Sequence, residues 1–132
     1  MKKRVDIKRL PEAELEIMLL LWQAECGVPR NYFDTQLQAR KNWADSTILS
    51  LLSRLAQKGF IKVEKDGNRN IYSALVTKDA YLAVENNSFL ARLHKNSLTD
   101  FVASMAHGGF LSCEDIDDLE AYLAALKQQR RE

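Results

Sequence analysis

The sequence predicts a mainly helical protein with one small β-hairpin and a further helical region at its C-terminal end. Three observations support this fold class. Apolar residues recur at helical spacing three times before residue 60. Two short strand-like runs then flank a glycine turn, and three more amphipathic segments follow. The 132 residues, 46% of them hydrophobic, are enough for one core or for a small domain with an appendage.

Two helices are predicted before residue 41. The first covers Pro11 to Ala24, because proline suits a first helical turn and the residues that follow form a wide apolar stripe. Gly27 is expected to end it. The second helix covers Arg30 to Arg40, with Phe33 and Leu37 facing inward.

A third helix is predicted from a cap at Asp45 or Ser46 to about Lys58, and Gly59 is expected to end it. Its apolar residues repeat at i, i+3, i+4 and i+7. They are Ile48, Leu51, Leu52 and Leu55. The opposite face of this helix is polar.

Two strands are predicted next, Phe60 to Glu64 and Asn70 to Leu75, joined at the strong turn signal Asp66-Gly67. Three helices followed by a hairpin are the winged helix-turn-helix arrangement, in which the second helix of the pair enters the DNA major groove. The chain thus divides into a basic arm at residues 1–9 and a winged helix-turn-helix DNA-binding domain at 10–75.

The chain after the hairpin changes character. Helices are predicted over Lys78–His94 and Ser97–Ala106, and a last helix starts at Ser112 after the Gly108-Gly109 break. Three short helices of about 50 residues rarely build an adequate core alone, so a second copy is the expected partner. Residues 76–128 are therefore predicted to form a helical dimerisation region. The interface candidates are Leu90, Leu93, Phe101, Ile116, Leu119 and Leu123.

The charge differs between the two halves of the chain. Residues 1–74 hold 13 basic and 9 acidic residues, a net charge of +4, whereas residues 75–132 hold 6 and 9, a net charge of −3. A basic front half favours an anionic partner for the winged domain.

Several function classes are disfavoured. Cys26 and Cys113 are far apart and show no metal-ligand spacing, so neither a metal nor another cofactor is expected. His94 and His107 lie away from any Ser, Cys or carboxylate motif, and no glycine-rich phosphate loop occurs, so an enzyme is not expected. The longest apolar run, Ile17 to Trp22, is too short for a bilayer, and the start does not read as a signal peptide. A cytoplasmic protein is therefore expected.

The polar face of the third helix carries most of the residues expected to contact DNA. Thr47 and Ser50 offer small donors and acceptors, and Arg54 and Gln57 can form two-pronged hydrogen bonds with guanine and adenine. The lysines and the arginine of the hairpin supply salt-sensitive attraction to phosphates. The predicted DNA-binding set is Ser46, Thr47, Ser50, Arg54, Gln57, Lys58, Lys62, Lys65 and Arg69.

The same residues resemble a known family. The run from Thr47 to Gly59, TILSLLSRLAQKG, is similar to the T-[VI]-x-T-x-L-x-R-L-x-x-K-G signature of the penicillinase-repressor (BlaI/MecI) family. The resemblance extends back to Leu10–Trp22 and forward through Asp66–Tyr72. It also includes Ser88-Phe-Leu and Leu111–Ile116, so it covers nearly all of residues 8–126.

The resemblance implies a homodimeric bacterial repressor that binds inverted-repeat operators of β-lactam-resistance-type genes. It assigns Thr47, Ser50 and Arg54 to operator contacts and residues 78–126 to the dimer interface. It also implies a membrane sensor or protease system as a partner in induction. Some members have an Asn-Phe bond at the cleavage position, where this chain has Ser104-Met105. The C-terminal CxC motifs of the copper-responsive branch do not occur here.

Two other functions remain open on the sequence alone. One is a ligand-sensing winged-helix regulator of the multiple-antibiotic-resistance type. That type usually places dimer helices at both chain ends, whereas here they collect at the C-terminus. The other is a winged helix used for protein–protein contacts.

Overall fold

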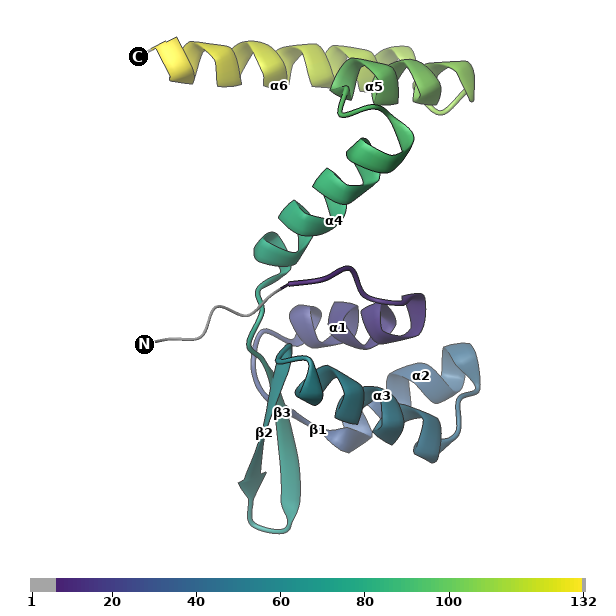
Figure 1. Cartoon of the computed structure of the whole chain (residues 1–132), viewed down its shortest axis with the longest axis vertical. Coiled ribbons are helices and arrows are strands. Elements are labelled where there is room, and N and C mark those ends of the chain that lie inside the picture. The colour runs from purple at the N-terminus through teal and green to yellow at the C-terminus, as the bar shows by residue number, and fades with distance from the viewer. Residues whose placement is uncertain (1–6, 132) are drawn as a thin grey trace. The chain divides into compact units, whose positions relative to one another are not determined.

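A computed structural model describes residues 7–131 and divides the chain into two compact units between Asn86 and Asn87. The first unit contains α1 (Glu12–Ala24), β1 (Val28–Pro29), α2 (Arg30–Lys41), α3 (Asp45–Gln57), β2 (Ile61–Asp66), β3 (Arg69–Ala74) and the start of α4 (Lys78–Leu93) (Figure 1). The second contains the end of α4, then α5 (Leu98–His107) and α6 (Cys113–Arg131). The predicted class, mainly helical with a small β wing, is confirmed. Most of the predicted arm, residues 1–9, lies outside the described residues.

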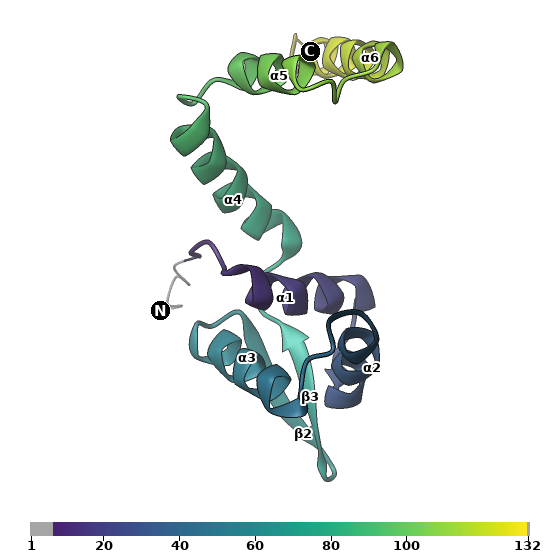
Figure 2. The same cartoon turned by 90° about the vertical axis from the view of Figure 1, so that its right-hand side faces the viewer.

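The core of the first unit is enclosed by α1, α2, α3 and the small sheet (Figure 2). The predicted inward residues Phe33 and Leu37 are fully buried, as are the four apolar residues of α3, none of which is more than 5% exposed. Burial of each such side chain contributes about 1.5–3 kcal/mol. The core therefore holds α3 by its whole apolar face.

The sheet has the order β1-β3-β2, with both pairs antiparallel. Strand β1 was not predicted, because two residues carry no readable periodicity. A Cβ on Gly27 would lie 2.7 Å from Cγ2 of Ile71, so glycine lets this segment approach β3. The prediction that Gly27 ends the first helix is wrong. Glu25 ends it instead, in the left-handed conformation with φ 62°.

The hairpin turn follows the predicted signal with a shift of one residue. Asp66 pairs with Arg69, so the two turn residues are Gly67 and Asn68. Gly67 has φ +65°, as a type II′ turn requires at its first central position. The wing is therefore a tight two-residue hairpin.

The start of α3 differs from the prediction. Ala44 is the N-cap, no side chain caps the helix, and Asp45 is already its first residue. The carboxylate of Asp45 accepts a hydrogen bond from Nε2 of Gln38 at 2.7 Å instead. The predicted cap at Asp45 or Ser46 is therefore wrong.

A buried ion pair ties α3 to α1. The Lys58 ammonium, just past the end of α3, donates to the carboxylate of Glu14, whose side chain is 4% exposed. Lys58 keeps 41% of its side chain exposed. The pair therefore neutralises an otherwise buried carboxylate at the edge of the core.

The compact unit extends beyond Leu75, because the first turns of α4 belong to its core. Tyr81 is 1% exposed and packs against Trp22 and Phe60, at ring-centroid distances of 5.7 and 6.0 Å. Its hydroxyl accepts a hydrogen bond from the Leu10 backbone N–H at 2.9 Å and donates one to Glu85.

The second unit is organised around a histidine. His94 is 9% exposed and lies 5.2 Å from the rings of both Phe89 and Phe101, and its Nδ1 lies 2.9 Å from Oδ2 of Asp100. The sequence assigned His94 to no Ser, Cys or carboxylate motif, and the structure places it beside Asp100. Residues of α5 and α6 are all at least partly exposed.

The predicted helix starts in this unit are confirmed. Ser97 caps α5 by accepting from the Asp100 N–H. Ser112 and Asp115 exchange reciprocal hydrogen bonds at the start of α6. Hydrogen bonds from Ser112, first from its backbone N–H and then from its side chain, lower the pKa of the Asp115 carboxyl. Cys26 and Cys113 are both exposed free thiols. Within residues 7–131, no helix is long and apolar enough to cross a membrane.

Replacement of Lys58 by Met should destabilise the full chain by about 1–3 kcal/mol, because it leaves the Glu14 carboxylate buried without a cation. The partial exposure of Lys58 keeps this loss below that of a fully buried pair. Lys62→Met is the matched control, since Lys62 pairs with Glu64 on the surface, and its effect should be below about 1 kcal/mol. Urea unfolding measures both, and equal small effects would contradict a structural role for Lys58.

Burial, followed by the hydrogen bond to Glu85, raises the pKa of Tyr81 to about 12. The unfolded chain deprotonates this phenol near pH 10. The stabilising contribution is therefore fully present below about pH 10 and is lost as the pH rises towards about 12. Unfolding free energies across this range should fall more steeply for the wild type than for Tyr81→Phe. Parallel pH profiles would show that Tyr81 is not the group responsible.

Candidate nucleic-acid interface

One exposed face of α3 collects the predicted contact residues of this helix. The buried apolar face leaves a polar arc on the opposite side, because residues three or four apart share a helix face. All five polar side chains are exposed, and none forms a hydrogen bond or ion pair with another group in the described part of the chain. They are Ser46, Thr47, Ser50, Arg54 and Gln57.

A shallow hollow lies along one flank of this face. It has a volume of about 310 Å³ and begins at the N-terminal turn of α3. Its lining residues are Ser46, Thr47, Ser50, Leu51 and Arg54. Hydroxyls at the positive end of a helix, beside a guanidinium, form a surface that attracts anions and can hydrogen-bond to base edges.

The predicted cations of the hairpin are placed differently from one another. Lys65 and Arg69 are exposed near the wing tip. Lys62 lies 2.7 Å from a carboxylate oxygen of Glu64, and the hydrogen bond and charge of Lys62 lower the pKa of that carboxyl. Lys58 is held by Glu14 on the side facing α1, so the structure does not bring it onto the polar arc of α3.

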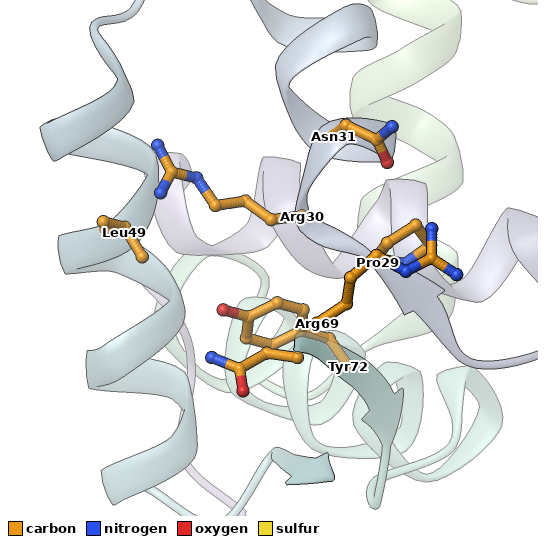
Figure 3. A pocket seen from close by; sticks show the side chains of 7 residues that line it. Pro29, Arg30, Asn31, Leu49, Arg69 and Tyr72 are labelled. Carbon is orange, nitrogen blue, oxygen red and sulfur yellow. The ribbon is translucent and has the colours of Figure 1, made fainter. Parts of the chain in front are cut away.

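A second hollow lies between α2, α3 and β3, and the sequence did not predict it (Figure 3). It has a volume of about 320 Å³ and is called the Arg30 hollow below. Its lining residues are Pro29, Arg30, Asn31, Leu49, Arg69, Asn70 and Tyr72. Only Arg69 belongs to the predicted set.

Arg30 reaches from the first residue of α2 towards α3 (Figure 3). Its Nε lies 3.8 Å from Oδ2 of Asp34, and its Nη2 lies 3.6 Å from Oδ2 of Asp45. Two sequence signals could have drawn attention to this hollow. Arg30 is a cation at a positive helix end, and Leu49 is an apolar residue, 42% exposed, on an otherwise polar face.

Comparison with known proteins agrees with this architecture. The penicillinase repressor of Bacillus licheniformis is 30% identical over 126 residues, which are 96% of this chain and 98% of the relative. The methicillin resistance regulatory protein MecI of Staphylococcus aureus (strain N315) is 27% identical over 114 residues, covering 86% of this chain and 92% of MecI.

Solved structures match the winged part of the chain. The DNA-binding domain of the repressor BlaI is 30% identical with a TM-score of 0.52, and the match covers 61% of this chain and 94% of that domain. The monomeric form of Bacillus licheniformis BlaI in complex with the blaP half-operator is 28% identical with a TM-score of 0.50, covering 58% and 92%. The penicillinase repressor family matches residues 10–125, and the chain belongs to that family.

Proposed function

We propose that this protein is a transcriptional repressor, not an enzyme, that binds specific DNA sequences with α3 in the major groove. The observation that carries the proposal is the division of α3 into two faces. Its apolar face is buried in the core, while five polar side chains on the other face form no hydrogen bonds within the described part of the chain. A relative with the same domain fold has been solved on a half-operator, which supports the proposal.

The roles of the polar residues follow from their chemistry. Arg54 matches the two acceptors of guanine, and Gln57 matches the donor and acceptor of adenine. Thr47 and Ser50, with Ser46, reach base edges or phosphates near the helix N-terminus. Lys62, Lys65 and Arg69 attract the phosphates beside the wing, and Lys58 adds charge while its ammonium remains bound to Glu14.

The active species is proposed to be a homodimer on an inverted-repeat operator. Within each protomer, α5, α6 and the loop between them expose large apolar side chains, among them Phe110 of the loop at 71% and Tyr122 of α6 at 64%. A second copy is the simplest cover for such a surface. Of the predicted interface residues, Leu93, Ile116, Leu119 and Leu123 are exposed in the single chain, and Leu90 and Phe101 are partly buried.

Release from DNA is proposed to depend on residues 97–109, on which a membrane sensor or a protease system would act. The repressor itself would be cytoplasmic and would control genes of the β-lactam-resistance type. Ser104 and Met105 lie inside α5. A protease needs an extended strand, so cleavage here requires α5 to open locally. Loss of α6 would then weaken the dimer and leave two weakly bound winged domains.

DNA binding should be specific and strongly dependent on salt. Fluorescence anisotropy with the DNA upstream of its own gene should show affinity falling steeply as salt rises, because each phosphate contact releases counterions. Arg54→Ala should cost about 1–3 kcal/mol and relax the preference at one base pair. Arg69→Ala should weaken all sequences alike and reduce the salt slope by about 1. Equal affinity for this DNA and for random DNA would refute a specific repressor.

Association should depend on the exposed apolar face of α6. Leu123→Asp places a charge in the proposed interface, so sedimentation should show a dimeric wild type and a largely monomeric variant at micromolar concentration. DNA binding should weaken in parallel, because linked half-sites gain from effective concentration. Leu75→Asp is the matched control, since Leu75 is 53% exposed in the first unit. A monomeric wild type, or a dimeric Leu123→Asp variant, would count against this interface.

A further inference from the structure

We propose that the Arg30 hollow binds one phosphodiester of the DNA backbone, with Arg30, Tyr72 and Arg69 as its polar groups. The inference rests on the proposed function and adds a specific contact to it. It concerns a hollow on the side of α3 that carries Leu49, whereas Thr47 and Arg54 line the other hollow.

Tyr72 supplies a hydroxyl with no internal partner on an otherwise buried side chain. The residue is 4% exposed and is fixed in the central strand, where it pairs with Val28 and with Val63. The hydroxyls of Tyr32 and Tyr81 donate to Leu20 O and to Glu85. Within residues 7–131 no such bond occurs for the Tyr72 hydroxyl, which points into the hollow (Figure 3). The buried side-chain atoms without a partner in the described residues are Arg30 Nε and Asp34 Oδ1, so the Tyr72 hydroxyl keeps contact with solvent and is open to a ligand.

Arg30 supplies a cation that is held in place, yet some of its guanidinium N–H donors have no hydrogen-bond partner in the described part of the chain. Both of its ion pairs, at 3.8 and 3.6 Å, are longer than hydrogen bonds. Its Nε is buried and finds no hydrogen-bond partner in the described residues. The guanidinium lies near the carboxylates of Asp34 and Asp45, at a helix end whose positive potential disfavours a cation.

Two further features make the hollow attractive to an anion. No side chain caps α2, so its first N–H groups keep their positive potential. Arg69 extends past Pro29 on the other side of the hollow from Leu49 (Figure 3). Arg69 therefore adds a second cation at the edge of the hollow.

The lining selects a backbone phosphate flanked by sugar over a free anion. Pro29, Leu49 and the ring of Tyr72 give the hollow an apolar floor that suits the carbon atoms of deoxyribose. The guanidiniums and the hydroxyl suit phosphate oxygens. With α3 in the major groove, the two backbones run along its two sides, and one of them would pass this hollow.

The test uses the full chain and a duplex that the wild type has selected from a random pool. Neutral methylphosphonate linkages replace single phosphates of the half-site, one position at a time. Anisotropy then gives affinity and salt slope for the wild type, Arg30→Gln and Tyr72→Phe. The matched control is Arg40→Gln, which removes the same charge from the exposed last turn of α2.

Arg30→Gln should weaken binding on the order of tenfold and reduce the salt slope by about 1, as loss of a charged phosphate contact requires. Tyr72→Phe should weaken binding a few-fold with an unchanged slope, since the hydroxyl is neutral. One methylphosphonate should weaken the wild type and Arg40→Gln equally, yet should leave Arg30→Gln almost unaffected. Inorganic phosphate, at matched ionic strength, should displace the duplex no better than chloride does.

The site would be overturned if the loss in binding free energy caused by Arg30→Gln simply added to the loss caused by each methylphosphonate. It would also be overturned if inorganic phosphate displaced the duplex better than chloride does. Circular-dichroism melting checks that the variants fold. If Arg30→Gln does not fold, coupling of Tyr72→Phe to a single linkage decides the question in the same way. A wild type that binds selected and random duplexes alike would overturn the proposed function as well. Specific wild-type binding without phosphate coupling would overturn this site alone.

Discussion

Burial of one face of α3 is the constraint on which the rest of the winged domain depends. Its four buried apolar residues fill the centre of the core, so rotation of the helix by even one residue, about 100°, would bring polar groups inside. The direction in which Thr47, Ser50 and Arg54 point is therefore set by packing on the opposite side. The apolar face of α3 is enclosed by α1 and α2 together with Phe60 and Tyr81, and this packing fixes the orientation of the helix.

The small sheet determines where α2 begins and therefore where Arg30 lies. β3 lies in the middle and pairs with a two-residue strand on one side and the wing strand on the other. Pairing of Val28 with Tyr72 fixes where α2 begins, because α2 follows β1 directly. Arg30 is thereby brought next to β3, although the two are far apart in the sequence. A glycine at position 27 makes this close approach possible.

Periodicity was enough to predict the helices, the hairpin and the polar face of α3, because each depends on residues close together in the chain. It could not predict contacts between distant segments. Lys58 was assigned to DNA on charge alone, and its partner Glu14 is 44 residues away. The hydrogen bond between Leu10 and Tyr81 joins residues 71 apart. The residues that line the Arg30 hollow come from four elements, β1, α2, α3 and β3, so no single stretch of sequence contains its pattern.

The two free thiols offer a direct use of the native sequence. Cys26 lies in the first compact unit and Cys113 in the second, and both are exposed. Paired spin labels or fluorophores could therefore be attached without introducing or removing a single residue. Distance distributions between the labels, recorded with and without duplex, would show whether DNA binding changes the separation of the two units.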